Sequence, residues 1–257
     1  MGLIQQTPNC SDFDVALGNA PSPAFRVLLP EHVSSELRVL HQRLAHTIPG
    51  DWRDTPAGKR GIIQIENGLE VSVDIERERD SIAVEMTVRN LSTGVLRHVA
   101  VDICAGVNHL PGRPGWCNRE FIPFAPLDRD EHGRYWYEQV TPRGLKALTT
   151  SGWRLMHPRP DHPSAEGLEP YASIVSERPV AFVCGARSYD GRKLFYQAWD
   201  VPCYYASPVS GNACMHLSPV VSESLESGAS ATTHGHVGIF EGDWDALAGE
   251  FAAFHGA

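Results

Sequence analysis

Two histidines near the C-terminus, His234 and His236, are separated by a single glycine. Residues two positions apart on a β-strand point to the same face of the sheet, so both imidazoles could bind one metal ion. A more distant histidine, His109 or His216, would then supply a further ligand. The alternative is that both are polar residues on the solvent side of a strand whose other side packs in the core.

The stretch from Gly228 to Glu241 resembles, in its spacing, the first half of the cupin metal motif. Cupins require a second motif downstream with a third histidine, and the residues after Glu241 are instead predicted to be helical. A metal-dependent enzyme that uses His234 and His236 therefore stays an alternative hypothesis, with a divalent metal as its cofactor. The preferred interpretation requires no cofactor.

His216 lies in the segment Cys214–Ser218, where Met215 and Leu217 alternate with it. Its side chain is therefore expected to point away from the core. On that basis we predict that it shares a surface with the histidines at 234 and 236.

A loop rich in proline and glycine, from Asn108 to Phe124, carries His109, Arg113, Trp116 and Arg119. These side chains suit an acidic sugar, because they offer a titrating base, forked donors for a carboxylate and an aromatic platform. Binding and catalytic residues concentrate on loops that a regular scaffold positions. We therefore expect this loop to line the main cleft.

Trp153 and Trp199 are further candidates for stacking on a sugar, with a structural role as the alternative. Glu85 and Asp102, on polar faces of predicted strands, could form a glycosidase-type pair, although such carboxylates usually face solvent. The sequence has no G-x-S-x-G elbow, P-loop or Rossmann glycine pattern. A serine hydrolase, an NTPase and a nicotinamide-dependent enzyme are therefore disfavoured.

The charge balance, 22 basic and 31 acidic residues for a net charge of −9, argues against nucleic acid as a partner. No apolar run is long enough for a membrane span, and no signal peptide is expected. None of the six cysteines forms a C-x-x-C pair, so no zinc ribbon or thioredoxin-type motif is present. Cys104 and Cys184 lie within apolar strand patterns, which predicts free, buried thiols in a reducing cytoplasm. A small-molecule or oligosaccharide substrate is expected, and an oligomer is possible.

Alternation of apolar and polar residues predicts the elements that position these side chains. Three consecutive runs, Leu69–Ile75, Ile82–Val88 and Val95–Val107, predict an antiparallel meander. Apolar residues at helical spacing predict a short amphipathic helix from Glu31 to His46, and a second helix from Asp243 to Phe254.

The fold class predicted is all-β: one large antiparallel β-sandwich with a short N-terminal helix and a C-terminal helix. The 257 residues are expected to form a single domain. Residues 1–60 would be an N-terminal arm and helix, 61–241 the sandwich and 242–257 the closing helix.

Three segments resemble the galactose-mutarotase-like supersandwich families. Ile82–Ser92 is similar to the "v-x-v-T-v-x-N-x-S" strand and turn of those domains, and Cys104–Phe124 looks like the loop that follows. Cys214–Pro219, with the final strand up to Gly242, resembles their C-terminal end. The resemblance covers roughly residues 61 to 255 and implies a concave sheet that faces a carbohydrate.

The sequence thus favours a carbohydrate-active protein that acts on a sugar or sugar acid by acid–base epimerisation or lyase-type elimination. The predicted catalytic residues are His109, His216, His236 and Arg119. Those predicted to bind substrate are Arg113, Trp116, Trp153 and Trp199. A non-catalytic carbohydrate-binding or assembly module, in which the aromatic residues matter and the histidines do not, is the second hypothesis.

Overall fold

The protein was analysed as a computed structural model. It describes residues 4–6, 11–20, 23–35, 38–41, 50–65, 68–106, 136–141, 144–149, 153–155, 172–174, 183–187, 192–201, 203–208 and 214–251. Only the backbone is described for residues 5, 38–41, 136–182, 184–187, 203–215 and 244 within these ranges.

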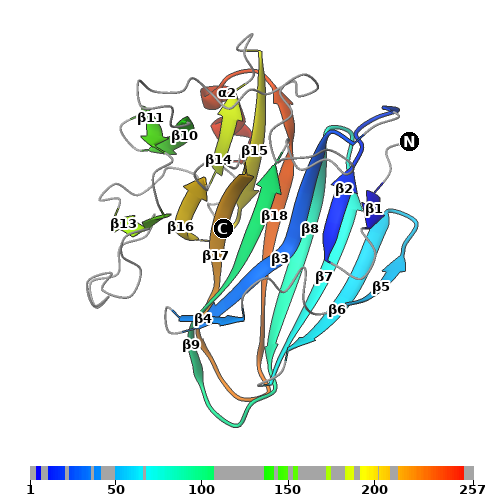
Figure 1. Ribbon diagram of the computed structural model, residues 1–257, viewed down its shortest axis with the longest axis vertical. Coiled ribbons are helices and arrows are strands. Elements are labelled where there is room, and N and C mark those ends of the chain that lie inside the picture. The colour runs from blue at the N-terminus through cyan, green and yellow to red at the C-terminus, as the bar shows by residue number, and fades with distance from the viewer. Residues whose placement is uncertain are drawn as a thin grey trace, which may run out of the picture.

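The described strands form two nine-stranded sheets that lie over one another (Figure 1). In sheet I the order is β1 (Ile4–Gln6), β2 (Asp12–Val15), β3 (Phe25–Ser35), β9 (Leu96–Gly106), β17 (Cys214–Leu225), β16 (Cys203–Pro208), β12 (Trp153–Leu155) and β13 (Ala172–Ile174), with β4 (Arg38–His41) paired to β3. In sheet II the order is β11 (Gly144–Thr149), β10 (Trp136–Thr141), β14 (Val183–Arg187), β15 (Lys193–Trp199), β18 (Ser230–Glu241), β8 (Ser81–Asn90), β7 (Leu69–Arg77), β6 (Gly58–Ile65) and β5 (Asp51–Asp54). All described pairs are antiparallel except β12 with β13.

One hydrophobic core lies between the two sheets. Phe13 and Val101 from sheet I pack in the same cluster as Val73, Met86 and Val237 from sheet II, and all five are fully buried. β7 and β8 alternate between this core and an outer face, as strands of a two-layer sandwich do. The predicted antiparallel β-sandwich is confirmed.

The predicted meander is correct for two of its three runs. β7 and β8 pair in antiparallel register, but β9 crosses to sheet I, where it lies between β3 and β17. Alternation could not reveal this crossing. A strand in either sheet of a sandwich buries one face, so the pattern is the same whichever sheet the strand joins.

The predicted helix from Glu31 to His46 is wrong in its described part, which forms the end of β3 and the strand β4. Val33, the first residue of the helical pattern, is fully buried in the sandwich core and pairs with Val101 of β9. Burial between sheets outweighs the helical spacing, which is a weak preference over so short a stretch. Residues 1–60 contribute the strands β1 to β5 to the two sheets.

A glycine hairpin and the predicted closing helix flank the strands of sheet II. Gly68, with a φ of 85°, forms the hairpin between β6 and β7, a conformation that favours glycine. Asp243 caps helix α2 (Trp244–Phe251), since its Oδ1 accepts a hydrogen bond from the Ala246 backbone N–H at 2.9 Å. Leu247 and Phe251 pack on the outer face of sheet II. Among the described residues, no helix is long and apolar enough to cross a membrane.

Asn90, in the N-x-S part of the strand-and-turn motif, stabilises the turn that follows β8, where the chain leaves sheet II. Its Nδ2 donates to the carbonyl oxygens of Gly94 (2.7 Å) and Leu225 (2.9 Å), and its Oδ1 accepts from the backbone N–H of Ser92 (2.9 Å). Its side chain is fully buried.

Asn90→Ala should therefore lower the free energy of unfolding by about 1–3 kcal/mol, because it leaves the Leu225 carbonyl group buried without this donor. Urea unfolding of both proteins would measure the difference. Leu91→Ala is the matched control, since Leu91 is exposed and its removal should change stability by less than about 0.5 kcal/mol. Equal losses in the two variants would contradict the role given to Asn90.

Candidate functional site

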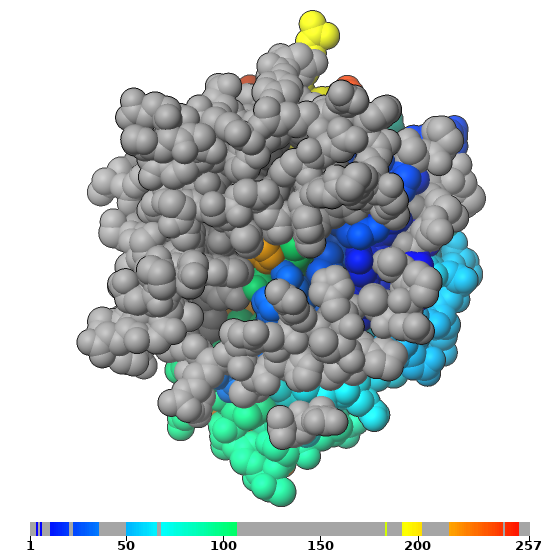
Figure 2. Space-filling view, in the orientation of Figure 1, coloured from blue at the N-terminus to red at the C-terminus, as the bar shows by residue number. Residues whose placement is uncertain are grey.

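The outer face of sheet I gathers titratable side chains from three central strands. Val101, Ile103 and Leu217 face the core, so Asp102 and Cys104 of β9 and His216 of β17 project to the opposite side. The register places Cys104 between Leu28 of β3 and His216, and it places His32 opposite Asp102. Figure 2 looks onto this face: blue atoms of β2 and β3, green atoms of β9 and orange atoms of β17 meet near its centre.

A buried acid–base pair lies in this group. The Nε2 atom of His216 is 2.7 Å from Oε2 of Glu31, and the two side chains are 3% and 16% exposed. When Glu31 is ionised its carboxylate only accepts hydrogen bonds, and the tautomer of His216 that donates to it from Nε2–H carries the imidazole lone pair on Nδ1. The arrangement orients the ring, and the carboxylate stabilises the imidazolium that forms when Nδ1 takes a proton.

Two further residues adjoin this pair. Oε1 of Glu31, the oxygen not bonded to His216, is 3.9 Å from Nε2 of His32. Donor atoms of Glu31, His32 and Asp102 all lie within 4.8 Å of one another, and so do those of Glu31, Cys104 and His216. Asp102 and Cys104 are each 2% exposed. Cys104 forms no disulfide and is buried, as predicted.

An ion pair adjoins the cluster toward the edge of sheet I. Arg26 donates to both carboxylate oxygens of Asp14, at 2.7 and 3.1 Å, and its Nε lies 3.2 Å from Asp12. Arg26 shares the outer face with Leu28, two positions further along β3. Guanidinium and carboxylate groups held in this way can donate to and accept from the hydroxyl groups of a bound polyol.

His234 and His236 both project from the outer face of sheet II, because Thr233 and Val237 beside them are buried in the interior. They are therefore on a different sheet from His216, and the predicted common surface of the three histidines is wrong. In the described part of the chain, the groups able to hold a metal do not include either residue. Nδ1 of His234 lies 2.8 Å from Asp200, and Nδ1 of His236 lies 3.2 Å from Glu78.

The environment of His234 changes its proton affinity. Partial burial lowers the pKa of His234, but the hydrogen bond and charge of Asp200, together with Glu85, outweigh burial and raise that pKa above its usual value. Folding therefore increases the proton affinity of His234 relative to the unfolded chain. The ring is 49% exposed, so solvent screens much of the interaction.

We expect the His234–Asp200 pair to stabilise the fold by roughly 0.2–1 kcal/mol, the range for exposed pairs. Because the folded-state pKa is raised, this contribution is complete below the unfolded pKa of about 6.5 and is lost as pH rises through the folded value. Urea unfolding of wild type and His234→Gln across pH would show a difference at low pH that shrinks at high pH. A difference that grows with pH would contradict this assignment.

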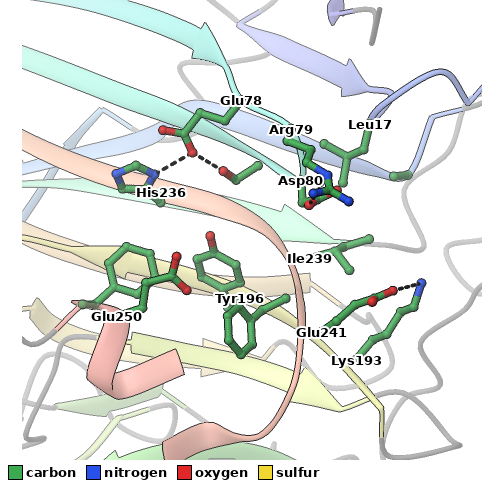
Figure 3. A pocket seen from close by; sticks show the side chains of 14 residues that line it. Leu17, Glu78, Arg79, Asp80, Lys193, Tyr196, His236, Ile239, Glu241 and Glu250 are labelled. Carbon is green, nitrogen blue, oxygen red and sulfur yellow. Dashed lines mark hydrogen bonds and ion pairs between the residues drawn. The ribbon is translucent and has the colours of Figure 1, made fainter. Parts of the chain in front are cut away.

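His236 lines a cavity of about 1010 Å³ between β15, β18 and helix α2 (Figure 3). The Glu78 carboxylate at its rim accepts from Ser81 and contacts His236, and Glu250 points into the space from the helix. Burial raises the pKa of Tyr196, whose phenol therefore stays protonated. The Glu78 side chain is 43% exposed, so its contact with His236 is weaker than the buried pair on sheet I.

Trp199, predicted to bind substrate, is fully buried in the core and pairs with Gly235 across β15 and β18. It cannot stack on a sugar from that position. Trp153 lies on β12, but its side chain is outside the described residues, as are the predicted site residues His109, Arg113, Trp116 and Arg119. Glu85 and Asp102 lie on different sheets and form no carboxylate pair.

Sequence reasoning did not find Glu31, His32 or Cys104 as members of the site, and it assigned Asp102 to solvent. The helical interpretation of residues 31–46 hid the first two. A signal was present nonetheless: Asp102 and Cys104 alternate with the apolar residues Val101 and Ile103, which marks polar residues on the face opposite the core.

The sequence matches no protein-family model and no curated protein. Among solved structures, an α-N-acetylgalactosaminidase from Bifidobacterium bifidum aligns with a TM-score of 0.50 at 13% identity, over 99% of this chain and 38% of the enzyme. The similarity to that enzyme is one of fold. Structures of galactose-mutarotase-like proteins are matched as well, at about 10% identity, as the predicted resemblance expected.

Two further structures are similar. A polysaccharide lyase aligns with a TM-score of 0.49 at 10% identity over 98% of this chain, which spans only 34% of the lyase. A galactose mutarotase related enzyme from Lactobacillus acidophilus aligns with a TM-score of 0.47 at 9% identity, over 94% of this chain and 98% of the enzyme.

Proposed function

We propose that this galactose-mutarotase-like protein is a carbohydrate-active enzyme that binds a sugar or sugar acid on the outer face of sheet I. The observation that carries the proposal is the part-buried contact of 2.7 Å between His216 and Glu31. An imidazole fixed in one tautomer by a carboxylate is preorganised for proton transfer. The solved structures named above, which are carbohydrate enzymes of the same fold, agree with this class of substrate.

In the proposed reaction His216 is the base and Glu31 is its positioning residue. Nδ1 takes a proton from the substrate, and Glu31 stabilises the resulting imidazolium through Nε2–H. In an epimerisation the proton returns to the other face of the same centre. In a lyase-type elimination the electron pair instead forms a carbon–carbon double bond and expels the leaving group from the neighbouring carbon. Arg113 and Arg119 are proposed to hold the substrate.

The pair on sheet I is preferred to His236 because of burial. Low local dielectric strengthens a hydrogen-bonded pair, whereas solvent screens the contact between His236 and its exposed partner Glu78. A buried pair also holds its geometry before the substrate arrives, which lowers the entropic cost of reaching the transition state.

A panel of neutral sugars and sugar acids would test the proposal. Ligand-observed NMR reports binding, anomer interconversion reports epimerisation, and ultraviolet absorbance of an unsaturated product reports elimination. His216→Gln should bind the same ligand without turning it over, while the control His234→Gln on sheet II should keep full activity. Binding without turnover by the wild type would instead support the non-catalytic module. Wild-type turnover by His216→Gln would reject the assigned base.

A further inference from the structure

We propose that the outer face of sheet I also binds one divalent transition-metal ion, through Glu31, His32 and Asp102. The inference rests on the proposed function, because the ion would lie beside the His216–Glu31 pair. It differs from the metal site expected from the sequence at His234 and His236, since those residues lie on the other sheet.

A β-bulge turns two neighbouring side chains toward the ion site. Leu28 pairs with Cys104 and His32 pairs with Asp102, so four steps along β3 match only two along β9. Extra residues of this kind re-aim side chains in a strand. Consecutive residues on a regular strand point to opposite faces, but here Glu31 and His32 both reach the group on the outer face.

The two oxygens of Glu31 have different neighbours, and this separation decides which group holds the ion. Oε2 is 2.7 Å from Nε2 of His216, a hydrogen-bond distance that leaves no room for an ion between them. Oε1 is 3.9 Å from Nε2 of His32, too long for a hydrogen bond. Two donors at that separation can both reach a common ion at about 2.0–2.2 Å.

Asp102 supplies the third ligand from the neighbouring strand. Its carboxylate lies opposite His32 in the register, and its donor atom is within 4.8 Å of those of Glu31 and His32. Two carboxylates this close in a buried site repel each other when both are ionised, and a cation between them converts the repulsion into attraction. Asp102 is 2% exposed, so water screens this effect little.

The ligand types indicate the class of metal. One imidazole and two carboxylates match the nitrogen and oxygen donors that first-row divalent ions such as Zn²⁺ and Mn²⁺ accept, and three protein ligands leave positions open for substrate. Such an ion would hold a carboxylate or carbonyl oxygen of the sugar and stabilise the negative charge that develops when His216 removes a proton. This favours a sugar acid as the substrate.

Metal binding by the full chain, without any sugar, tests the inference. After treatment with EDTA and dialysis, titration calorimetry with ZnCl₂ and with MnCl₂ should show one ion per chain for at least one metal. Asp102→Asn and His32→Gln should each weaken its affinity by at least about 10-fold. The control His98→Gln, which changes a histidine bonded to Glu223 outside this group, should bind as the wild type does. Thermal unfolding without metal shows whether each variant is folded.

Each outcome decides the matter. Absence of binding above the level of the triple variant His32→Gln/Glu31→Gln/Asp102→Asn overturns the proposal. If Cys104→Ser loses affinity for the metal while Asp102→Asn keeps it, this ligand set is overturned in favour of Glu31, Cys104 and His216. Sugar turnover at the full rate in the metal-free protein rejects the ion's role while leaving the proposed acid–base function intact. If the wild type binds the ion but turns over no sugar, the proposed function is rejected and the metal site stands.

Discussion

His216→Gln is expected to lower kcat for the sugar substrate by about 10²–10⁴-fold, the usual contribution of a positioned general base. The glutamine amide can still donate to Glu31, as Nε2–H of the imidazole does, but it has no basic nitrogen. The fold should therefore persist while proton transfer is lost. Initial rates at saturating substrate, together with the substrate affinity from ligand-observed NMR, separate the two effects.

Glu31→Gln should lower kcat less, because Glu31 orients the ring and stabilises its charge without itself taking the proton. The double variant should be no slower than His216→Gln alone, since positioning has no effect once the base is absent. Additive losses would mean that Glu31 acts independently of His216, and its role as a positioning residue would be rejected.

Trp199→Ala should lower the free energy of unfolding by about 3–5 kcal/mol, as expected for an aromatic side chain removed from a close-packed interior. Trp199 is among the largest fully buried side chains of the described core. Urea unfolding monitored by far-ultraviolet circular dichroism would measure the loss. Trp199→Phe keeps an aromatic ring at the position and should cost considerably less.

Gly235 provides a second test of the same packing. A Cβ atom added to Gly235 would overlap the indole ring of Trp199, so Gly235→Ala should destabilise the wild type. In the Trp199→Ala background the overlap is gone, and the same substitution should cost much less. Unchanged stability in Trp199→Ala, combined with loss of sugar binding, would support the surface role that the sequence suggested for this tryptophan.

Much of the fold follows from local sequence patterns. Alternation in Leu69–Ile75 and Ile82–Val88 defines strands β7 and β8, because only one face of each can be buried. Gly68 and Asp243 mark a hairpin and a helix start by chemistry that acts within a few residues. These features need no information about distant parts of the chain.

The partners of the strands were decided by the tertiary structure. The pattern of β9 satisfies burial in either sheet, so the sequence could not tell that β9 leaves β8 and joins β3 and β17. The segment after Glu31 shows helical spacing, yet pairing with β9 holds its beginning in a strand. Burial of Trp199 was equally undetermined, because an indole ring suits a core and a sugar-binding surface alike.

The same distinction applies to the site. The alternation around His216 correctly places its side chain on the face opposite the core. Its partner Glu31 is 185 residues away in the chain and reaches it only through the pairing of β3 and β17 with β9. The period of a strand determines which face a side chain occupies, because that depends on neighbouring residues alone. Which side chains meet on that face depends on the order and register of the strands, and only the folded sheet determines these.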